Sequence, residues 1–228
     1  MNPSVKTTRT EISARSLDQI ACASMPYNQV AIGDSLRSPH PLRLSRGLPT
    51  TTDFSLLKGR NLLAVVDDDN LRISMQQCRR PLSYSILLSR LQNESGYVFP
   101  LTVLTVQAGD LKRELELKGN GWNVLVIPKE NVFTITGPQI KANADFDLAF
   151  ELGHLVNSIQ FDTVLLGTGD GDLAVAVGRG IRRTCPRIRL LTLSVPASTS
   201  TRLRTRPDLF DGNIAVGCNL SSHQNLQN

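Results

Sequence analysis

The stretch FDTVLLGTGDGDL, from Phe161 to Leu173, decides the fold that we expect for this chain. Its apolar run, Thr163 to Leu166, is closed by Gly167, and a short apolar run bounded by glycines is typical of a buried strand in a parallel sheet. Two carboxylates, Asp170 and Asp172, follow that strand. They fall at the carboxyl end of the strand, which is the edge where open α/β sheets bind ligands.

The two aspartates need an explanation, because like charges separated by one glycine repel each other. Each is also costly to desolvate, so the pair requires a cation, a shared proton or open water nearby. Surface turns rich in Asp and Gly are common, and the motif alone is equally consistent with such a turn. Further carboxylates at equivalent places in the chain favour a functional cluster.

The length and the cysteines indicate one ordinary globular domain. A chain of 228 residues is long enough for one sizeable α/β core and too short for two comfortable domains. Its four cysteines are scattered without a Cys-x-x-Cys or Cys/His cluster, which indicates neither a zinc site nor a disulfide framework. No apolar run approaches the length that spans a bilayer, and the N-terminus lacks a secretory signal. We therefore expect a cytoplasmic protein with no membrane partner.

We expect residues 1–58 to form a flexible tail, because they show no sustained hydrophobic period and contain five prolines among many polar residues. The first 50 residues carry six Lys or Arg against three acids, a composition loosely like an organelle transit peptide, which is the alternative to a cytoplasmic location. The folded domain is expected over 59–217, and 218–228 is expected to be a disordered tail.

Apolar runs that predict strands alternate with periodic segments that predict helices. The other strands are expected at 61–66, 99–106, 122–127 and 188–195, and the helices at 71–91 with an interruption at Pro81, 110–118 with Asp110 as N-cap, 140–159 and 173–183. We place the short apolar stretch 132–135 in a loop, and 214–216 completes the domain. The alternation predicts an α/β fold with one doubly wound parallel sheet of about five strands, in the order 3-2-1-4-5, with helices on both faces.

Carboxylates occur at two further places near the centre of this predicted sheet. Asp67 ends the first strand, which neighbours the fourth in the order 3-2-1-4-5. Asp145 starts the helix 140–159 on the side of its apolar stripe, one helical step after Lys141, and should therefore face the core, whereas Asp147 lies on the polar side. The alternative for Asp145 is an interaction with its own helix N-terminus and a pair with Lys141.

The convergence of Asp67, Asp145, Asp170 and Asp172 predicts a site for a hard divalent cation, Mg²⁺ or Mn²⁺. Such a site serves phosphoryl chemistry. Between Leu173 and Pro207 the chain has eight arginines and no acid, which suits a polyanion held beside the metal. The arginines that we expect to contact this substrate first are Arg179, Arg182 and Arg183. The alternative is a solvated helix face followed by a basic loop.

Several segments resemble NYN domains, which belong to the PIN-like nuclease superfamily. VVDDDN at 65–70 resembles their strand-one motif, and KANADFDLA at 141–149 resembles their Lys-to-Asp helix motif. LLGTGDGDL at 165–173 resembles the family signature, usually Ser-Gly-Asp-Gly-Asp-Phe. PASTSTRLRTRPDLF at 196–210 is similar to the Ser-rich loop and helix of the LabA-like branch. The resemblance spans about Arg60 to Val216.

The resemblance implies a PIN-like, metal-dependent ribonuclease that acts on single-stranded RNA. Asp67, Asp145, Asp170 and Asp172 would ligate the metal, Asn70 would orient a ligand or water, and Thr168 and Lys141 would contact the substrate. The chain departs from the family pattern at Thr168 for Ser, at Leu173 for Phe, and at Asp68 where a small residue is common. Alternation along an extended segment groups Asp67 with Asp69 and points Asp68 away.

Two other functions stay open. A haloacid-dehalogenase-like phosphatase would use Asp67 and Asp69 as nucleophile and acid, with Lys141 in support and Asp170 on Mg²⁺, although that family prefers Thr or Val where this chain has Asn70. A PIN-like domain that binds RNA or a protein partner without cutting is the third reading. Homo-oligomer formation and the identity of the RNA stay open as well.

Overall fold

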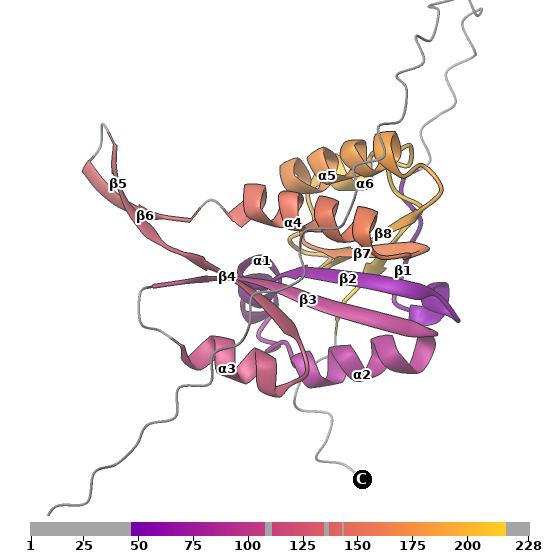
Figure 1. The fold of residues 1–228 in the computed structure, drawn as a ribbon, viewed down its shortest axis with the longest axis horizontal. Coiled ribbons are helices and arrows are strands. Elements are labelled where there is room, and N and C mark those ends of the chain that lie inside the picture. The colour runs from indigo at the N-terminus through magenta and orange to yellow at the C-terminus, as the bar shows by residue number, and fades with distance from the viewer. Residues whose placement is uncertain (1–46, 108–110, 135–136, 143, 218–228) are drawn as a thin grey trace, which may run out of the picture. The chain divides into compact units, whose positions relative to one another are not determined.

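The computed structural model describes residues 47–107, 111–134, 137–142 and 144–217, and the fold is carried by a seven-stranded sheet (Figure 1). The strands are β1 (Thr50–Thr51), β2 (Asn61–Asp67), β3 (Tyr97–Val106), β4 (Asn123–Pro128), β7 (Thr163–Gly167), β8 (Arg189–Ser194) and β9 (Gly212–Ala215). They lie in the order β1-β9-β8-β7-β2-β3-β4, and every neighbouring pair is parallel.

The five predicted strands correspond to β2, β3, β4, β7 and β8, and their order in the sheet, β4-β3-β2-β7-β8, is the predicted 3-2-1-4-5. The count of five is wrong because β9 and β1 extend the sheet beyond β8. β2 occupies the centre, and its residues 62–66 are all buried, which explains their unbroken apolar run. Alternate side chains of β2 enter two different cores on the two faces of the sheet.

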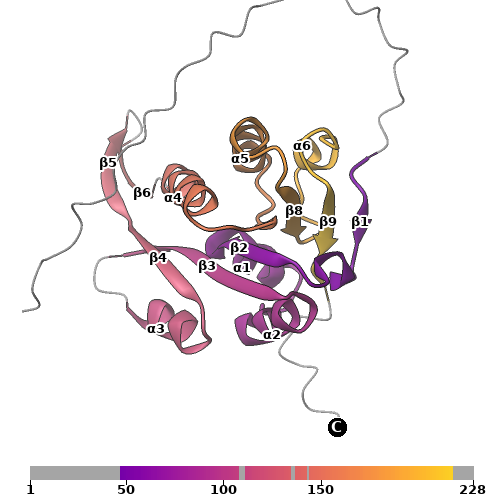
Figure 2. The same cartoon turned by 45° about the vertical axis from the view of Figure 1, so that its right-hand side comes forward.

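Three helices cover each face of the sheet (Figures 1 and 2). α1 (Asp68–Gln77), α2 (Tyr84–Glu94) and α3 (Lys112–Gly119) pack against one face. α4 (Ala144–Ser158), α5 (Gly171–Thr184) and α6 (Thr201–Arg204) pack against the other, with α4 and α5 side by side. The long helix expected over 71–91 is split into α1 and α2, since Arg79 takes a positive φ of 56° shortly before Pro81.

The predicted domain start at residue 59 is wrong, because residues before it belong to the packed structure. Leu48, Phe54 and Leu57 are buried, the last two in the 3-10 helix η1 (Phe54–Leu57). The Nη1 of Arg189 donates to the carbonyl of Leu56 at 2.8 Å. The remainder of the expected tails, 1–46 and 218–228, and the expected N-cap Asp110 lie outside the described residues.

A two-stranded antiparallel ribbon precedes α4. It consists of β5 (Glu130–Thr134) and β6 (Gly137–Lys141), in a segment expected to be a loop followed by the start of a helix. Lys141 pairs with Glu130 in this ribbon, so the helix starts only at Ala144 and Lys141 does not share a helix face with Asp145. None of the described helices is long and apolar enough to span a membrane.

Candidate active site at the carboxyl edge of the sheet

Three loops meet at the carboxyl ends of the central strands. β2 and β7 are neighbours in register, with Val66 opposite Gly167, so the loops that follow them start side by side. The backbone N–H of Gly169 donates to the side-chain oxygen of Asn70 at 2.6 Å, and the N–H of Ser200, after β8, donates to the carbonyl of Gly169 at 3.1 Å. These bonds hold the loops after β2, β7 and β8 together.

Asp67 and Asp170 are the N-caps of the helices that follow these two strands. The Oδ1 of Asp67 accepts from the N–H of Asn70 at 3.1 Å. The Oδ1 of Asp170 accepts from the N–H groups of Asp172 at 2.7 Å and Leu173 at 3.3 Å. Each carboxylate is therefore fixed through one oxygen at the positive end of a helix, and its other oxygen accepts no hydrogen bond from the described residues.

Asp145 lies in the first turn of α4 and completes a group of three carboxylates from three elements. The predicted apolar stripe is confirmed, since Leu148, Leu152 and Leu155 are buried, but Asp145 is exposed rather than core-facing. It belongs to the first helical turn, where the packed core has ended. Partial desolvation and then the charge of Asp170 raise the pKa of Asp145.

Asp67 is the most perturbed carboxyl of this group. Burial raises the pKa of Asp67 from 3.8 to about 6, the hydrogen bond from Asn70 opposes that rise, and the charges of Asp145, Asp69 and Asp68 add to it. The charged groups that act most strongly on Asp67 are thus all carboxylates. We call Asp67, Asp145 and Asp170 the acidic edge.

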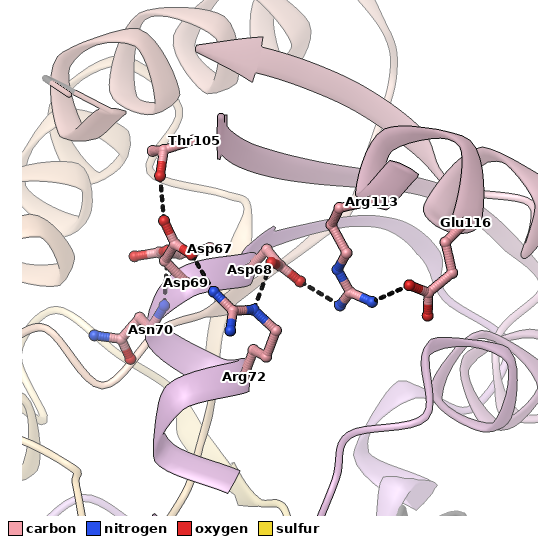
Figure 3. A network of polar contacts seen from close by, with 8 residues as sticks. All are labelled: Asp67, Asp68, Asp69, Asn70, Arg72, Thr105, Arg113 and Glu116. Carbon is pink, nitrogen blue, oxygen red and sulfur yellow. Dashed lines mark hydrogen bonds and ion pairs between the residues drawn. The ribbon is translucent and has the colours of Figure 1, made fainter. Parts of the chain in front are cut away.

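Asp68 is fully buried and points away from the acidic edge, toward two half-buried arginines (Figure 3). Its carboxylate accepts from Nε of Arg72 at 3.1 Å and from Nη2 of Arg113 at 2.7 Å, and Arg113 also pairs with Glu116 at 2.8 Å. The prediction that Asp68 turns away is confirmed, although Asp68 starts α1 and the segment is not extended there. Its role is structural, because both of its cationic partners lie on helices of the α1–α3 face.

Asp69 is held by two groups and is not free beside Asp67 as the alternation suggested. It forms a salt bridge with Arg72 on α1 and accepts a hydrogen bond from the hydroxyl of Thr105 near the end of β3 (Figure 3). Asp69 therefore still adds negative charge near Asp67, but that charge is largely neutralised by Arg72. The helical start at Asp68 explains the difference, since successive residues on a helix do not alternate between two faces.

Asp172 also stands apart from the acidic edge. Its side chain is exposed and forms a salt bridge with Arg202 of α6, so the predicted metal ligand is already paired with a cation. Asp170, its neighbour two residues before, is the residue whose charge acts on Asp145. Asp147, which the sequence placed on the polar side of its helix, is exposed as expected.

Asn70 and Thr168 hold the loops at this edge together. Thr168 is fully buried, so its predicted substrate contact is wrong, and its hydroxyl accepts from the N–H of Asp170 at 3.1 Å. Asn70 accepts from Gly169, as described above, and both residues thereby position Asp170. A Cβ on Gly169 would lie 2.9 Å from the carbonyl oxygen of Ser198, so the glycine allows this close approach.

The basic residues predicted to contact substrate have different surroundings. Arg182 donates to the carbonyls of Leu209 at 2.8 Å and Ile188 at 3.0 Å and pairs with Asp211 at 2.8 Å, so its guanidinium joins parts of the fold and its predicted substrate role is wrong. Arg179 and Arg183 are exposed on α5. Lys141 lies in β6, and its side chain is outside what the structure describes.

The donor chemistry of the acidic edge fits a hard divalent cation, because carboxylate oxygens are the ligands that Mg²⁺ and Mn²⁺ prefer. The side chains of the described residues do not, however, gather three or more His, Cys, Asp or Glu in an arrangement that could hold a metal ion. The carboxylates of the acidic edge are near enough to repel one another, but they do not form a ready coordination shell.

No protein-family model matches this chain, and no curated protein matches it. Among solved structures, the crystal structure of a protein of unknown function from Vibrio parahaemolyticus RIMD 2210633 is similar, with a TM-score of 0.55 and 20% sequence identity. The match covers 72% of this chain and 96% of that one. A likeness at this identity shows the fold alone, so the chain shares an α/β fold with that bacterial protein and its function has to be argued from its own residues.

Proposed function

We propose that this protein is a Mg²⁺- or Mn²⁺-dependent ribonuclease whose reaction centre is the acidic edge. The observation that carries the proposal is the state of Asp67, a carboxyl at the end of the central strand whose pKa is raised to about 6 by burial and by neighbouring carboxylates. A site that concentrates negative charge in this way is stabilised by a bound cation. The resemblance of the motifs around Asp67, Asp145 and Asp170 to NYN domains supports the same conclusion.

The residues of the acidic edge have distinct parts in this proposal. Asp67 and Asp170 are held by helix N–H groups, each with one carboxylate oxygen left for a metal or its water shell. Asp145 adds the third carboxylate from the first turn of α4. A bound divalent ion would supply an activated water and would neutralise charge on the phosphodiester. Asn70 and Thr168 keep the loop of Asp170 in place.

Phosphate groups of the RNA would be contacted by arginines that lie at this edge. Arg202 lies in the first turn of α6 and forms a salt bridge with Asp172, directly beside the loop of Asp170. A guanidinium can bind a phosphate through two parallel hydrogen bonds, and an exposed, weak ion pair is easily exchanged for one. Arg179 and Arg183 lie along α5, which runs away from the edge, so they would contact only RNA that continues past the site.

The structure supports the phosphatase alternative less well than the sequence alone does. It needs Asp69 to act as a general acid, which requires a protonated carboxyl. The carboxylate of Asp69 is instead engaged within the fold, since it pairs with Arg72 and accepts a hydrogen bond from Thr105. The non-cleaving RNA-binding domain is the alternative that an experiment has to separate from the nuclease.

The test is a cleavage assay on the purified full chain with labelled single-stranded RNA in Mg²⁺, Mn²⁺ or EDTA. Asp67→Asn and Asp145→Asn should each lower the cleavage rate by at least about 100-fold, because the metal contributes several kcal/mol to the barrier. Asp147→Asn is the matched control, since it removes an exposed carboxylate two residues from Asp145 and should leave the rate unchanged.

Two results would replace the proposal by an alternative. RNA binding without cleavage under any divalent ion would make the protein a binding domain. Hydrolysis of a small phosphomonoester through a trapped aspartyl-phosphate at Asp67 would make it a phosphatase, in which Asp67 is the nucleophile.

A further inference from the structure

An open groove of about 570 Å³ runs between α4 and α5 on the outer side of the sheet. Its walls include the small residues Ala149 and Gly153 of α4 and Ala176 and Gly180 of α5. A Cβ placed on Gly153 or Gly180 would meet nothing within 4 Å, so the groove has room for a side chain from outside. Nothing in the acidic edge uses this surface.

Two phenylalanines that are exposed to solvent lie next to this groove. Phe146 and Phe150 lie one helical turn apart on α4, with 73% and 81% of their surface exposed, the highest values among the large hydrophobic side chains of the described residues. Large aromatic side chains side by side at the surface of a soluble domain mark an interaction site. The groove and the phenylalanines together form one apolar face, which we call the α4–α5 face.

Charges flank this face in an ordered way. Around α4, at about 100° per residue, Phe146 and Phe150 lie roughly 20–60° from Gly153. Two acids, the exposed Asp147 and the half-buried Glu151, lie roughly 120–160° from Gly153 in the same direction. Across the groove, the exposed Arg179 lies on the outer side of α5. The order across the face is therefore acid, phenylalanine, groove, arginine.

We propose that the α4–α5 face is the interface of a symmetric dimer with a second copy of this chain. Consider a two-fold axis that runs parallel to the helices, between the phenylalanines and the groove. Rotation about this axis reverses, on the second copy, the order acid, phenylalanine, groove, arginine. That one operation places the phenylalanines of each copy on the groove of the other. It also places the acids of each copy opposite the arginines of the other.

The positions along the helices agree with this pairing. α4 precedes β7 and α5 follows it, so both helices run away from the carboxyl edge of the sheet, and Gly153 and Gly180 line the same groove at equivalent heights, each nine residues after its helix start. Glu151 then lies about one residue, or roughly 1.5 Å, from the height of Arg179. The axis preserves height, so Glu151 of one copy meets Arg179 of the second copy.

The area available suits a specific dimer. Four phenylalanines, two from each copy, each bury about 150–250 Å² when covered, which is a large share of the roughly 1,200–2,000 Å² that a standard interface buries. The arrangement also leaves both acidic edges on the same side of the dimer, because the axis runs parallel to the helices. This inference does not rest on the proposed ribonuclease activity.

The first test measures the mass of the full chain by light scattering and sedimentation equilibrium over a range of concentrations. The wild type should be a dimer, and Phe150→Glu should raise the dissociation constant by at least 100-fold without changing the circular dichroism spectrum, since Phe150 touches solvent in the single chain. Leu115→Glu is the matched control, because Leu115 is an exposed apolar residue, at 66%, on α3 at the opposite face. It should leave the dimer intact.

The second test identifies the pairing across the interface. Glu151→Arg and Arg179→Glu should each weaken the dimer at least 10-fold, because each places like charges opposite each other twice. A mixture of the two variants should form heterodimers of wild-type strength, since both contacts are then of opposite charge.

A monomeric wild type, a dimer that survives Phe150→Glu, or a mixture that fails to associate would each overturn the proposal. If the wild type is a monomer and Phe150→Glu binds RNA more weakly than the wild type, the α4–α5 face would be assigned to RNA instead.

Discussion

The side-chain oxygen of Asn70 accepts a hydrogen bond from the backbone N–H of Gly169 at 2.6 Å, which joins the loop after β2 to the loop after β7. Asn70→Ala removes the acceptor and leaves a backbone donor unpaired, so we expect the free energy of unfolding to fall by about 1–2 kcal/mol in urea denaturation. Asn123→Ala is the control, because Asn123 makes its hydrogen bond to Pro100 at an exposed position. An equal loss in both variants would contradict a special role for Asn70.

Asp67 should make the protein less stable as the pH rises from about 4 to about 6. Its pKa in the folded state is about 6 against an ordinary value of 3.8, so the folded protein binds this proton more tightly than the unfolded chain. The carboxyl therefore favours folding at low pH, and its ionisation disfavours the folded state by at most about 3 kcal/mol at pH 7.

Asp67→Asn should remove this dependence on pH. The amide keeps an oxygen that accepts from the N–H of Asn70 but carries no charge. Chemical denaturation without metal between pH 4 and pH 7 should show a flatter stability profile for the variant and a higher stability than wild type at pH 7. A variant that is less stable than wild type at pH 7 would contradict the assignment.

The buried ion pairs of Asp68 should be far more important for folding than the exposed salt bridge of Asp172. Asp68→Ala leaves Arg72 and Arg113 without their buried partner, and removal of one member of such a network costs about 3–5 kcal/mol. Asp172→Ala breaks an exposed pair with Arg202 and should cost less than about 1 kcal/mol. Thermal and urea unfolding of the two variants would give the comparison directly.

Gly171 should not accept a side chain, because a Cβ there would lie 2.3 Å from the Oγ and 2.8 Å from the Cβ of Ser200. Gly171→Ala should force the loops after β7 and β8 apart and destabilise the protein by about 1–3 kcal/mol. Gly119→Ala, at the end of α3 with nothing within 4 Å of the added Cβ, should be neutral or slightly stabilising. Similar unfolding midpoints for the two variants would show that the loops can move to accommodate the added Cβ and would contradict this prediction.

RNA binding should depend on Arg202 and not on Arg187. Arg202 lies at the carboxyl edge, whereas the exposed Arg187 precedes β8 and so lies at the opposite edge of the sheet. Arg202→Gln should lower the slope of log affinity against log salt by about 0.7 for a single-stranded RNA, while Arg187→Gln should keep the wild-type slope. Affinities measured between 50 and 300 mM salt, about a sixfold range, would separate the two.

The centre of the sheet could be predicted from the sequence, whereas its edges could not. β2 and β7 have unbroken apolar runs because both of their faces are covered by helices, and such runs are visible without a structure. β1 has two residues and β9 has four, too few for a period to emerge. The ribbon β5–β6 was missed for another reason: its antiparallel pairing depends on contacts between two strands and not on the pattern of either one.

The members of the acidic edge could be predicted, but their surroundings could not. Strand ends and helix starts are local features, so Asp67, Asp145 and Asp170 were found from short segments of sequence. Thr168 and Arg182 looked equally suited to bind a substrate, yet one is buried and the other joins Leu209 and Asp211 to α5. Such partners are set by the folded chain, and no spacing in the sequence reports them.

The peptide bond between Asp67 and Asp68 separates two carboxylates with opposite surroundings. The buried charge of Asp68 is balanced by two half-buried arginines, whereas Asp67 faces further carboxylates at the edge of the sheet. The ion pairs of Asp68 therefore stabilise the start of α1 without involving the carboxylates of the acidic edge. An engineer could retune the charge of the edge, by changing Asp67 or Asp145 for a different metal or for none, and keep the scaffold beneath it unaltered.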